Sequence, residues 1–217
     1  MAEPASILVR EQFNNPQQQR ETATLGMWVF IITEMMLFGG LFTAYTVYRL
    51  NYYQGFTEAS GEMKFWMGAV NTAVLICSSF TMAMAVHSAE TGKKRRLVLF
   101  LVSTIAIGLV FLAIKFTEYY LHYQEHKVPG LWFEASGPHA APEQMFFVFY
   151  FIMTGLHATH MIIGIGILSV MILRSAFGSI SENYHTLIDI TGLYWHFVDV
   201  IWVFLFAIFY IPGGHLR

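Results

Sequence analysis

Seven ionisable side chains lie within otherwise apolar stretches of the sequence, and they are the residues best placed to do chemistry. They are Glu34, Lys115, Glu118, His157, His160, His196 and Asp199. Charged groups at membrane depth are costly, so they normally face the protein interior and mark proton, ion or ligand sites. A carboxyl group held in an apolar interior can exchange protons near neutral pH.

Two pairs of these residues, His157/His160 and His196/Asp199, are spaced three apart, so each pair shares a helix face. At a rise of about 1.5 Å per residue, Glu34, His160, His196 and Asp199 lie roughly 12–20 Å from one membrane surface. We therefore expect these five residues to form a polar core at mid-membrane. The core is open to three interpretations: interhelical hydrogen bonds, a proton or ion site on Glu34, or bis-histidine haem ligation.

Haem ligation is the least favoured of the three interpretations. His157 and His160 lie one turn apart on the same predicted helix, so they cannot bind opposite faces of one haem. Lys115 and Glu118 are also one turn apart, near the outer end of their span. We expect them to neutralise each other, with snorkelling of both side chains to the interface as an alternative.

A zinc-peptidase pattern, H-x-x-E-H, is formed by His122, Glu125 and His126. Such a site needs a third ligand, for which Glu134 or Glu143 would serve. The pattern ends a predicted membrane span and leads into a short loop, with no second domain to form a substrate cleft. We therefore interpret it as an exposed helix end.

The composition excludes most soluble classes. Of 217 residues, 56% are hydrophobic and only 12% charged, against about 25% charged in a typical soluble domain. A net charge of -2 offers no basic field for nucleic acid, and one cysteine cannot form an intrachain disulfide. Five apolar stretches are long enough to span a bilayer. They are residues 25–48, 65–86, 97–121, 145–173 and 188–211.

The predicted fold is all-α: one polytopic bundle of five transmembrane helices. The domain organisation is a polar N-terminal tail (1–24), the bundle (25–212) and a C-terminal tail (213–217). The basic run at residues 93–96 predicts a cytoplasmic loop between the second and third spans. This places the N-terminus inside and the C-terminus outside.

Three runs resemble the helices of a known family, cytochrome c oxidase subunit III. They are GMWVFIITEMMLF (26–38), TGLHATHMIIG (154–164) and YWHFVDVIW (194–202). Glu118 with Tyr119 resembles the family's Glu-Tyr step. Arg174, His185 and Asp189 stand where the family has an arginine, a histidine and an acidic residue. The order of the motifs fits across most of residues 25–212.

The resemblance implies an accessory subunit of a haem–copper oxidase, which has no haem or copper of its own. In such a complex haem and copper lie in partner subunits, and subunit III packs mainly on the catalytic subunit I, with subunit II nearby. It also implies bound phospholipid and support for proton uptake, with Arg174, His185, Asp189 and Glu118 as lipid or subunit contacts.

One departure from the family concerns length. Longer members have seven spans, and this sequence lacks the first two, whose place a small subunit IV would fill. The five-span form resembles bacterial subunit III, so we expect the bacterial cytoplasmic (inner) membrane.

Two alternatives remain at this point. The chain could serve a quinol oxidase or a nitric oxide reductase instead of a cytochrome c oxidase. The Thr33-Glu34 step resembles cytochrome c oxidases more closely and therefore favours that type of partner. A stand-alone proton or ion transporter using Glu34 and Asp199 is the alternative from another class. Five spans offer no two equal inverted halves for such a transporter.

Overall fold

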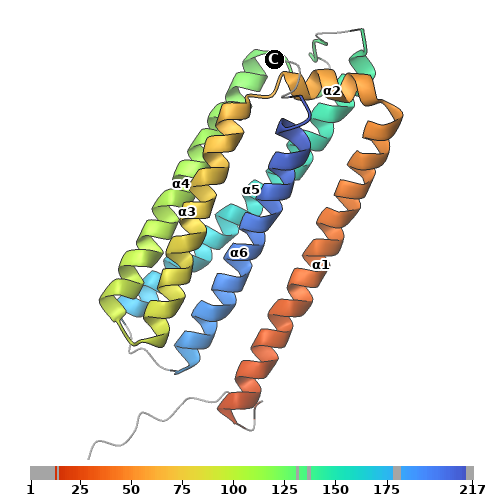
Figure 1. Ribbon diagram of the computed structural model, residues 1–217. Helices are drawn as coiled ribbons and strands as arrows, with labels where there is room; N and C mark the ends of the chain where they lie inside the picture. The colour runs from red at the N-terminus through yellow and green to blue at the C-terminus, as the bar shows by residue number, and fades with distance from the viewer. Residues whose placement is uncertain (1–12, 14, 131, 136–137, 178–181, 214–217) are drawn as a thin grey trace, which may run out of the picture.

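The protein is described by a computed structural model that covers residues 13, 15–130, 132–135, 138–177 and 182–213. These residues form helices joined by short connections, and no strand occurs among them. The helices are α1 (Pro16–Asn51), α2 (Tyr53–Gly61), α3 (Phe65–Glu90), α4 (Lys94–Gln124), α5 (Ala140–Phe177) and α6 (Glu182–Tyr210). Figure 1 shows the five long ones as an elongated bundle.

The five predicted spans are confirmed. Helices α1, α3, α4, α5 and α6 are all long and apolar enough to cross a membrane. The all-α polytopic fold predicted from the sequence is therefore the observed one, and the chain is a multi-pass membrane protein. The N-inside orientation stays a prediction from the basic run at residues 93–96, because a bundle alone does not show which end faces the cytoplasm.

Helix α1 begins earlier than the sequence analysis predicted, so residues 16–24 of the expected tail are helical. The start signal is local. The Asn15 side chain accepts a hydrogen bond of 2.7 Å from the Gln18 backbone N–H, and Pro16 occupies the first turn. Both features favour a helix start, since asparagine caps free N–H groups and proline has none to lose. Most of the predicted tails, residues 1–12 and 214–217, lie outside the described part of the chain.

The short helix α2 was not predicted. It lies across one end of the bundle, close to the end of α6 (Figure 1). The Ser60 hydroxyl fixes it there by donating to the Phe209 carbonyl at 2.7 Å and accepting from the Gly213 N–H at 3.0 Å. Phe56 is buried and packs edge-on against Tyr45 of α1. Helix α2 thus closes the end of the bundle between α1, α5 and α6.

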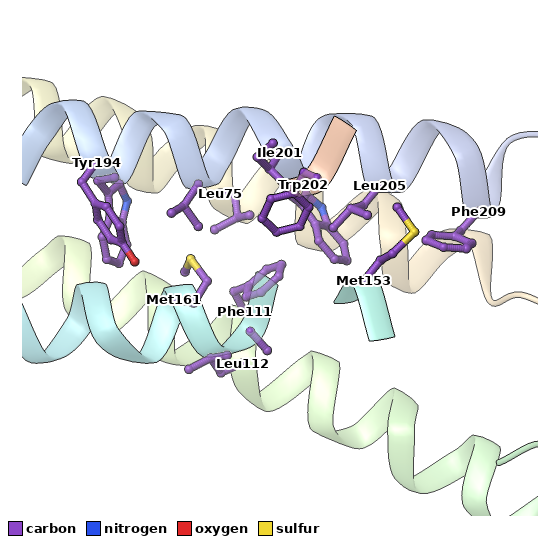
Figure 2. Packing of buried hydrophobic residues seen from close by; sticks show 14 of the residues in the cluster. Leu75, Phe111, Leu112, Met153, Met161, Tyr194, Ile201, Trp202, Leu205 and Phe209 are labelled. Carbon is purple, nitrogen blue, oxygen red and sulfur yellow. The ribbon is translucent and has the colours of Figure 1, made fainter. Parts of the chain in front are cut away.

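The core is centred on α6, whose tryptophans are fully buried. Figure 2 shows Trp202 reaching from α6 towards Phe111 of α4, and their rings meet edge to face at 4.8 Å between centroids. Trp195 packs where α4 and α5 both carry glycine: a Cβ on Gly108 or Gly164 would lie within 3.2 Å of its ring. Small residues let membrane helices approach closely, and here they make room for an indole.

Gly68 of α3 gives a direct test of this close packing. A Cβ at Gly68 would lie 2.8 Å from the Tyr210 ring and 3.0 Å from the Phe206 ring of α6. Gly68→Val is therefore expected to separate α3 from α6 and to cost about 1–3 kcal/mol, the usual cost of overpacking. The thermal denaturation midpoint measures this cost. Gly26→Val, where a Cβ meets nothing within 4 Å, is the control, and an equal loss in both variants would contradict the packing.

Candidate functional site: polar groups among the membrane helices

Glu34 and His160 form a buried contact between α1 and α5. Glu34 Oε2 lies 3.2 Å from His160 Nε2, and both side chains are less than one fifth exposed. His160 Nδ1 lies 2.8 Å from the Leu156 carbonyl, which only accepts, so Nδ1 carries a hydrogen and donates it. Nε2 is then the nitrogen that faces Glu34. A carboxyl group that faces an imidazole nitrogen in the protein interior is a candidate site for holding a proton.

Residues around the Glu34–His160 pair connect it to a third helix, α6. The Tyr194 hydroxyl of α6 donates to the His160 carbonyl at 2.9 Å. The Phe38 ring, one turn after Glu34, packs 5.8 Å from the His160 ring. The contact therefore ties α1 to α5 and α6, although little of α1 is otherwise buried.

His157 lies apart from this pair, although it shares a helix with His160. It is buried between the rings of Phe111 and Trp202, at 5.5 and 5.3 Å between centroids. Neither of its ring nitrogens has a hydrogen-bond partner in the described ranges. His157 therefore packs as an aromatic ring within the core.

His196 and Asp199 lie on another face of α6, towards α3. His196 Nδ1 lies 2.7 Å from the Ser79 hydroxyl. Both carboxyl oxygens of Asp199 are buried without a hydrogen-bond partner in the part of the chain that the structure describes. No hydrogen bond or ion pair among the described residues joins these two to Glu34 or His160. The five predicted residues thus occupy three places, not one polar core.

A second buried network surrounds Lys115 of α4. Its ammonium donates to Glu118 at 3.0 Å, to Tyr150 of α5 at 2.8 Å and to Tyr210 of α6 at 2.8 Å. The Tyr210 hydroxyl donates to the other oxygen of Glu118 at 2.7 Å. The side chains of Lys115 and Glu118 are 2% and 0% exposed. The expected neutralisation is therefore present, and the snorkelling alternative is wrong because α5 and α6 cover both groups.

The zinc-peptidase pattern is not assembled as a metal site. His122 is buried in α4 and packs against Phe147 and Tyr150. His126 lies exposed beyond the helix with a positive φ of 55°. Among the described residues, no three histidine, cysteine or acidic side chains are close enough to hold a metal ion. Glu125 pairs with Lys64 at 3.0 Å and also faces His122, whose Nδ1 lies 3.4 Å from a Glu125 oxygen. The expectation of an exposed helix end is therefore wrong for His122, which aromatic rings cover.

Lys127 fastens the loop after α4 to two other segments. It contacts Glu62 after α2 at 2.9 Å and also pairs with Glu143 in α5. Burial lowers the pKa of Lys127, but the hydrogen bonds to Glu143 and Glu62 outweigh this effect and raise its pKa above the ordinary value.

A raised lysine pKa fixes the sign of the pH dependence. The stabilisation is fully present below the unfolded-state pKa of about 10.4 and is lost as the pH rises through the folded-state value. The difference in denaturation midpoint between wild type and Lys127→Met is expected to stay constant from neutral pH to about 10 and to shrink above it. Thermal scans at several pH values measure this, and shrinkage between pH 7 and 9 would contradict the pairing.

The remaining predicted contacts lie at the end of the bundle opposite α2. Asp189 of α6 pairs with Arg20 of α1 at 3.6 Å. Together with His185 and Glu90 they line an open polar pocket. Arg174 is exposed in the last turn of α5 and does not line this pocket. The structure therefore places His185 and Asp189 in one pocket, leaves Arg174 outside it, and puts Glu118 in the buried network of Lys115.

Comparison with known proteins assigns the chain to a family. Residues 12–214 match the family described as cytochrome c oxidase subunit III. The chain belongs to this family. Cytochrome c oxidase subunit 3 of Thermostichus vulcanus is 32% identical over 188 residues, which cover 86% of each chain. The Danio rerio subunit 3 is 29% identical over 87% of this chain and 69% of its own. Quinol oxidase subunit 3 of Bacillus subtilis is 28% identical over 92% and 94%.

Membership in the subunit III family confirms the resemblance read from the sequence, and it implies association with other oxidase subunits. Sequence reasoning missed three of the polar partners in this subunit III chain: Ser79, Tyr150 and Tyr210. Each is a neutral residue that is common in membrane helices, so its type gave no signal. The signal lay in the ionisable residues that needed them, His196 and the Lys115/Glu118 pair, because buried polar and charged groups require hydrogen-bond partners.

Proposed function

We propose that the chain is the non-catalytic subunit III of a proton-pumping terminal oxidase that reduces oxygen to water in a bacterial cytoplasmic membrane. In this proposal haem and copper belong to partner subunits, and the chain stabilises subunit I, supports proton uptake and holds lipid. The observation that carries it is the Glu34–His160 pair within a chain of the subunit III family.

The pair suits a supporting role in proton uptake. His160 Nδ1 is committed to the Leu156 carbonyl, so Nε2 and the Glu34 carboxyl are the groups of the pair left to exchange a proton. Glu34 lies about 27 Å along α1 from Pro16 by the helical rise, so its contact with His160 of α5 is deep in the bundle. A site that holds one proton at this depth can buffer proton delivery to a neighbouring subunit without a metal of its own.

A stabilising and lipid-holding role fits the outer surface. One side of α1 is exposed and apolar, as expected for a helix that packs on subunit I, a small additional subunit or lipid tails. At the end of the bundle opposite α2, Arg20, which pairs with Asp189, and the exposed indole of Trp28 line one pocket along α1. An arginine fork suits a lipid phosphate and an indole suits the membrane interface.

The electron donor we propose is cytochrome c, on the basis of the Thr33-Glu34 step. A quinol oxidase is the second candidate, because the match to the quinol oxidase subunit 3 of Bacillus subtilis covers nearly the whole length of that relative. The donor itself binds to another subunit in either case.

The proposal is tested by purifying the chain through a tag in mild detergent and recording the optical spectrum and composition of what accompanies it. The expected result is a haem spectrum together with a large copper-containing subunit and oxidation of reduced cytochrome c. Oxidation of quinol alone would select the second candidate. A colourless chain without partners, showing proton flux in vesicles, would contradict the proposal and favour a transporter.

A further inference from the structure

A groove runs along the outer surface between α3 and α6. Its rim is apolar: Ile76 and Phe80 of α3 are 61% and 65% exposed, and Val200 and Val203 of α6 are about half exposed. Four polar residues, Thr72, Ser79, His196 and Asp199, line the groove among mostly apolar neighbours.

Two of the polar side chains that line the groove, Asp199 and His196, make fewer hydrogen bonds than their atoms allow. Asp199 is 7% exposed, and neither of its oxygens has a well-formed hydrogen bond in the described ranges. The one described polar side chain that interacts with this carboxyl is Ser79, whose hydroxyl is already engaged with His196. His196 uses Nδ1 for the Ser79 hydroxyl, and its Nε2 makes no hydrogen bond to another described residue. A buried carboxyl without a good hydrogen bond costs several kcal/mol in an apolar medium. In the isolated chain Asp199 therefore lacks a hydrogen-bond donor.

The depth of this site places it beyond the reach of lipid headgroups. Ser79 lies 14 residues from the start of α3 and 11 from its end, which is roughly 21 and 16 Å along the axis. This is the middle of a membrane core about 30 Å thick. Lipid tails present only hydrocarbon there, so they cannot donate a hydrogen bond.

The shape of the groove fits a helix. Thr72, Ile76, Ser79 and Ala83 follow one another at intervals of four, three and four, so they line one face of α3. Three of the four are small, and small residues on one face are what membrane helices use to approach closely. The exposed aliphatic side chains of α6 form the opposite wall.

We infer that this groove docks a membrane helix of another oxidase subunit, and that a hydroxyl, amide or ammonium group on that helix hydrogen-bonds to Asp199 and His196. The inference rests on the proposed function, because it takes the partner from the same complex. It names the surface and the chemistry of the contact: an apolar helix with one hydrogen-bond donor near its middle.

A photo-crosslinking amino acid at Phe80 tests the position of the partner in native membranes. The expected adduct joins the tagged chain to a subunit of the haem-containing complex, and the same probe at Leu109, exposed on α4, is the control. An adduct with lipid alone, with a second copy of this chain, or equally strong adducts from both positions would overturn the inference. The proposed function is tested separately by whether haem purifies with the tag. Haem that still purified with the tag would leave the proposed function standing in each of these cases.

Two substitutions test the contact itself. Ala83→Trp fills the groove with an indole, and Asp199→Leu removes the carboxyl. Each is expected to lower the haem recovered per tagged chain about five-fold, which corresponds to one interhelical hydrogen bond of about 1 kcal/mol. Leu109→Trp and Asp199→Asn are the matched controls and should retain the haem. Unchanged haem recovery in Ala83→Trp would overturn the docking surface, whatever the folding of the Asp199 variants.

Discussion

Lys115→Met is expected to destabilise the bundle by about 3–5 kcal/mol, the cost of leaving a buried carboxylate without its counter-ion. The Lys115 ammonium bonds to Glu118, Tyr150 and Tyr210, and none of these groups reaches solvent. Methionine has a similar volume, so the loss reports charge and hydrogen bonding, not a cavity. The thermal denaturation midpoint of the purified complex measures it.

Two controls separate the buried network from ordinary ion pairing. The Lys64–Glu125 pair has the same length, 3.0 Å, but is partly exposed. Lys64→Met is therefore expected to cost only about 0–1 kcal/mol. The double variant Lys115→Met with Glu118→Gln should recover most of the lost stability, since a neutral amide can still bond to the Tyr210 hydroxyl. If the double variant were less stable than Lys115→Met, the unpaired charge would not be the cause.

Glu34→Ala is expected to leave the haem spectrum unchanged and to accelerate the loss of oxidase activity during turnover. The substitution removes the carboxyl partner of His160 and the main polar tie between α1 and α5. A hydrogen bond to a charged group is worth about 1.5–3 kcal/mol. If α1 holds the complex in its active state, this corresponds to inactivation about 10- to 100-fold faster. The activity time course measures the effect.

Glu34→Gln distinguishes the two roles of this carboxyl. An amide can keep the contact with His160 but cannot exchange a proton at neutral pH. We expect it to restore much of the lifetime while the rate of proton uptake stays low. Recovery of both by glutamine would contradict the proton-holding role, and loss of the haem spectrum from an intact Glu34→Ala complex would contradict the accessory role.

The five spans could be predicted from the sequence because uninterrupted apolar length is sufficient evidence for a membrane helix. The ends of the helices were harder to predict from the sequence. Asn15 and Pro16 are a recognisable start signal for α1, yet hydropathy placed the boundary at Leu25 because the first turns of the helix are polar. Helix α2 has no apolar run, and Ser60 positions it through the Phe209 carbonyl, which hydropathy does not reveal.

The candidate site was predicted only in part. The helical rise gives depth, so Glu34 and His160 were correctly placed at a common level, and the structure brings them into contact. The rise does not give the direction in which each helix face points in the bundle. That direction depends on packing around Trp195 and Trp202, which turns His196 and Asp199 towards α3 and leaves His157 between aromatic rings.

The central claim is that the chain supports a catalytic centre that lies in other subunits. The most direct measurement compares oxidase purified with and without this chain, following haem content, initial activity and activity during sustained turnover. Equal haem per catalytic subunit and comparable initial activity are expected in both preparations, followed by markedly faster inactivation and slower proton uptake in the one without the chain. Loss of haem from the chain-free complex, or identical lifetimes in both preparations, would contradict it.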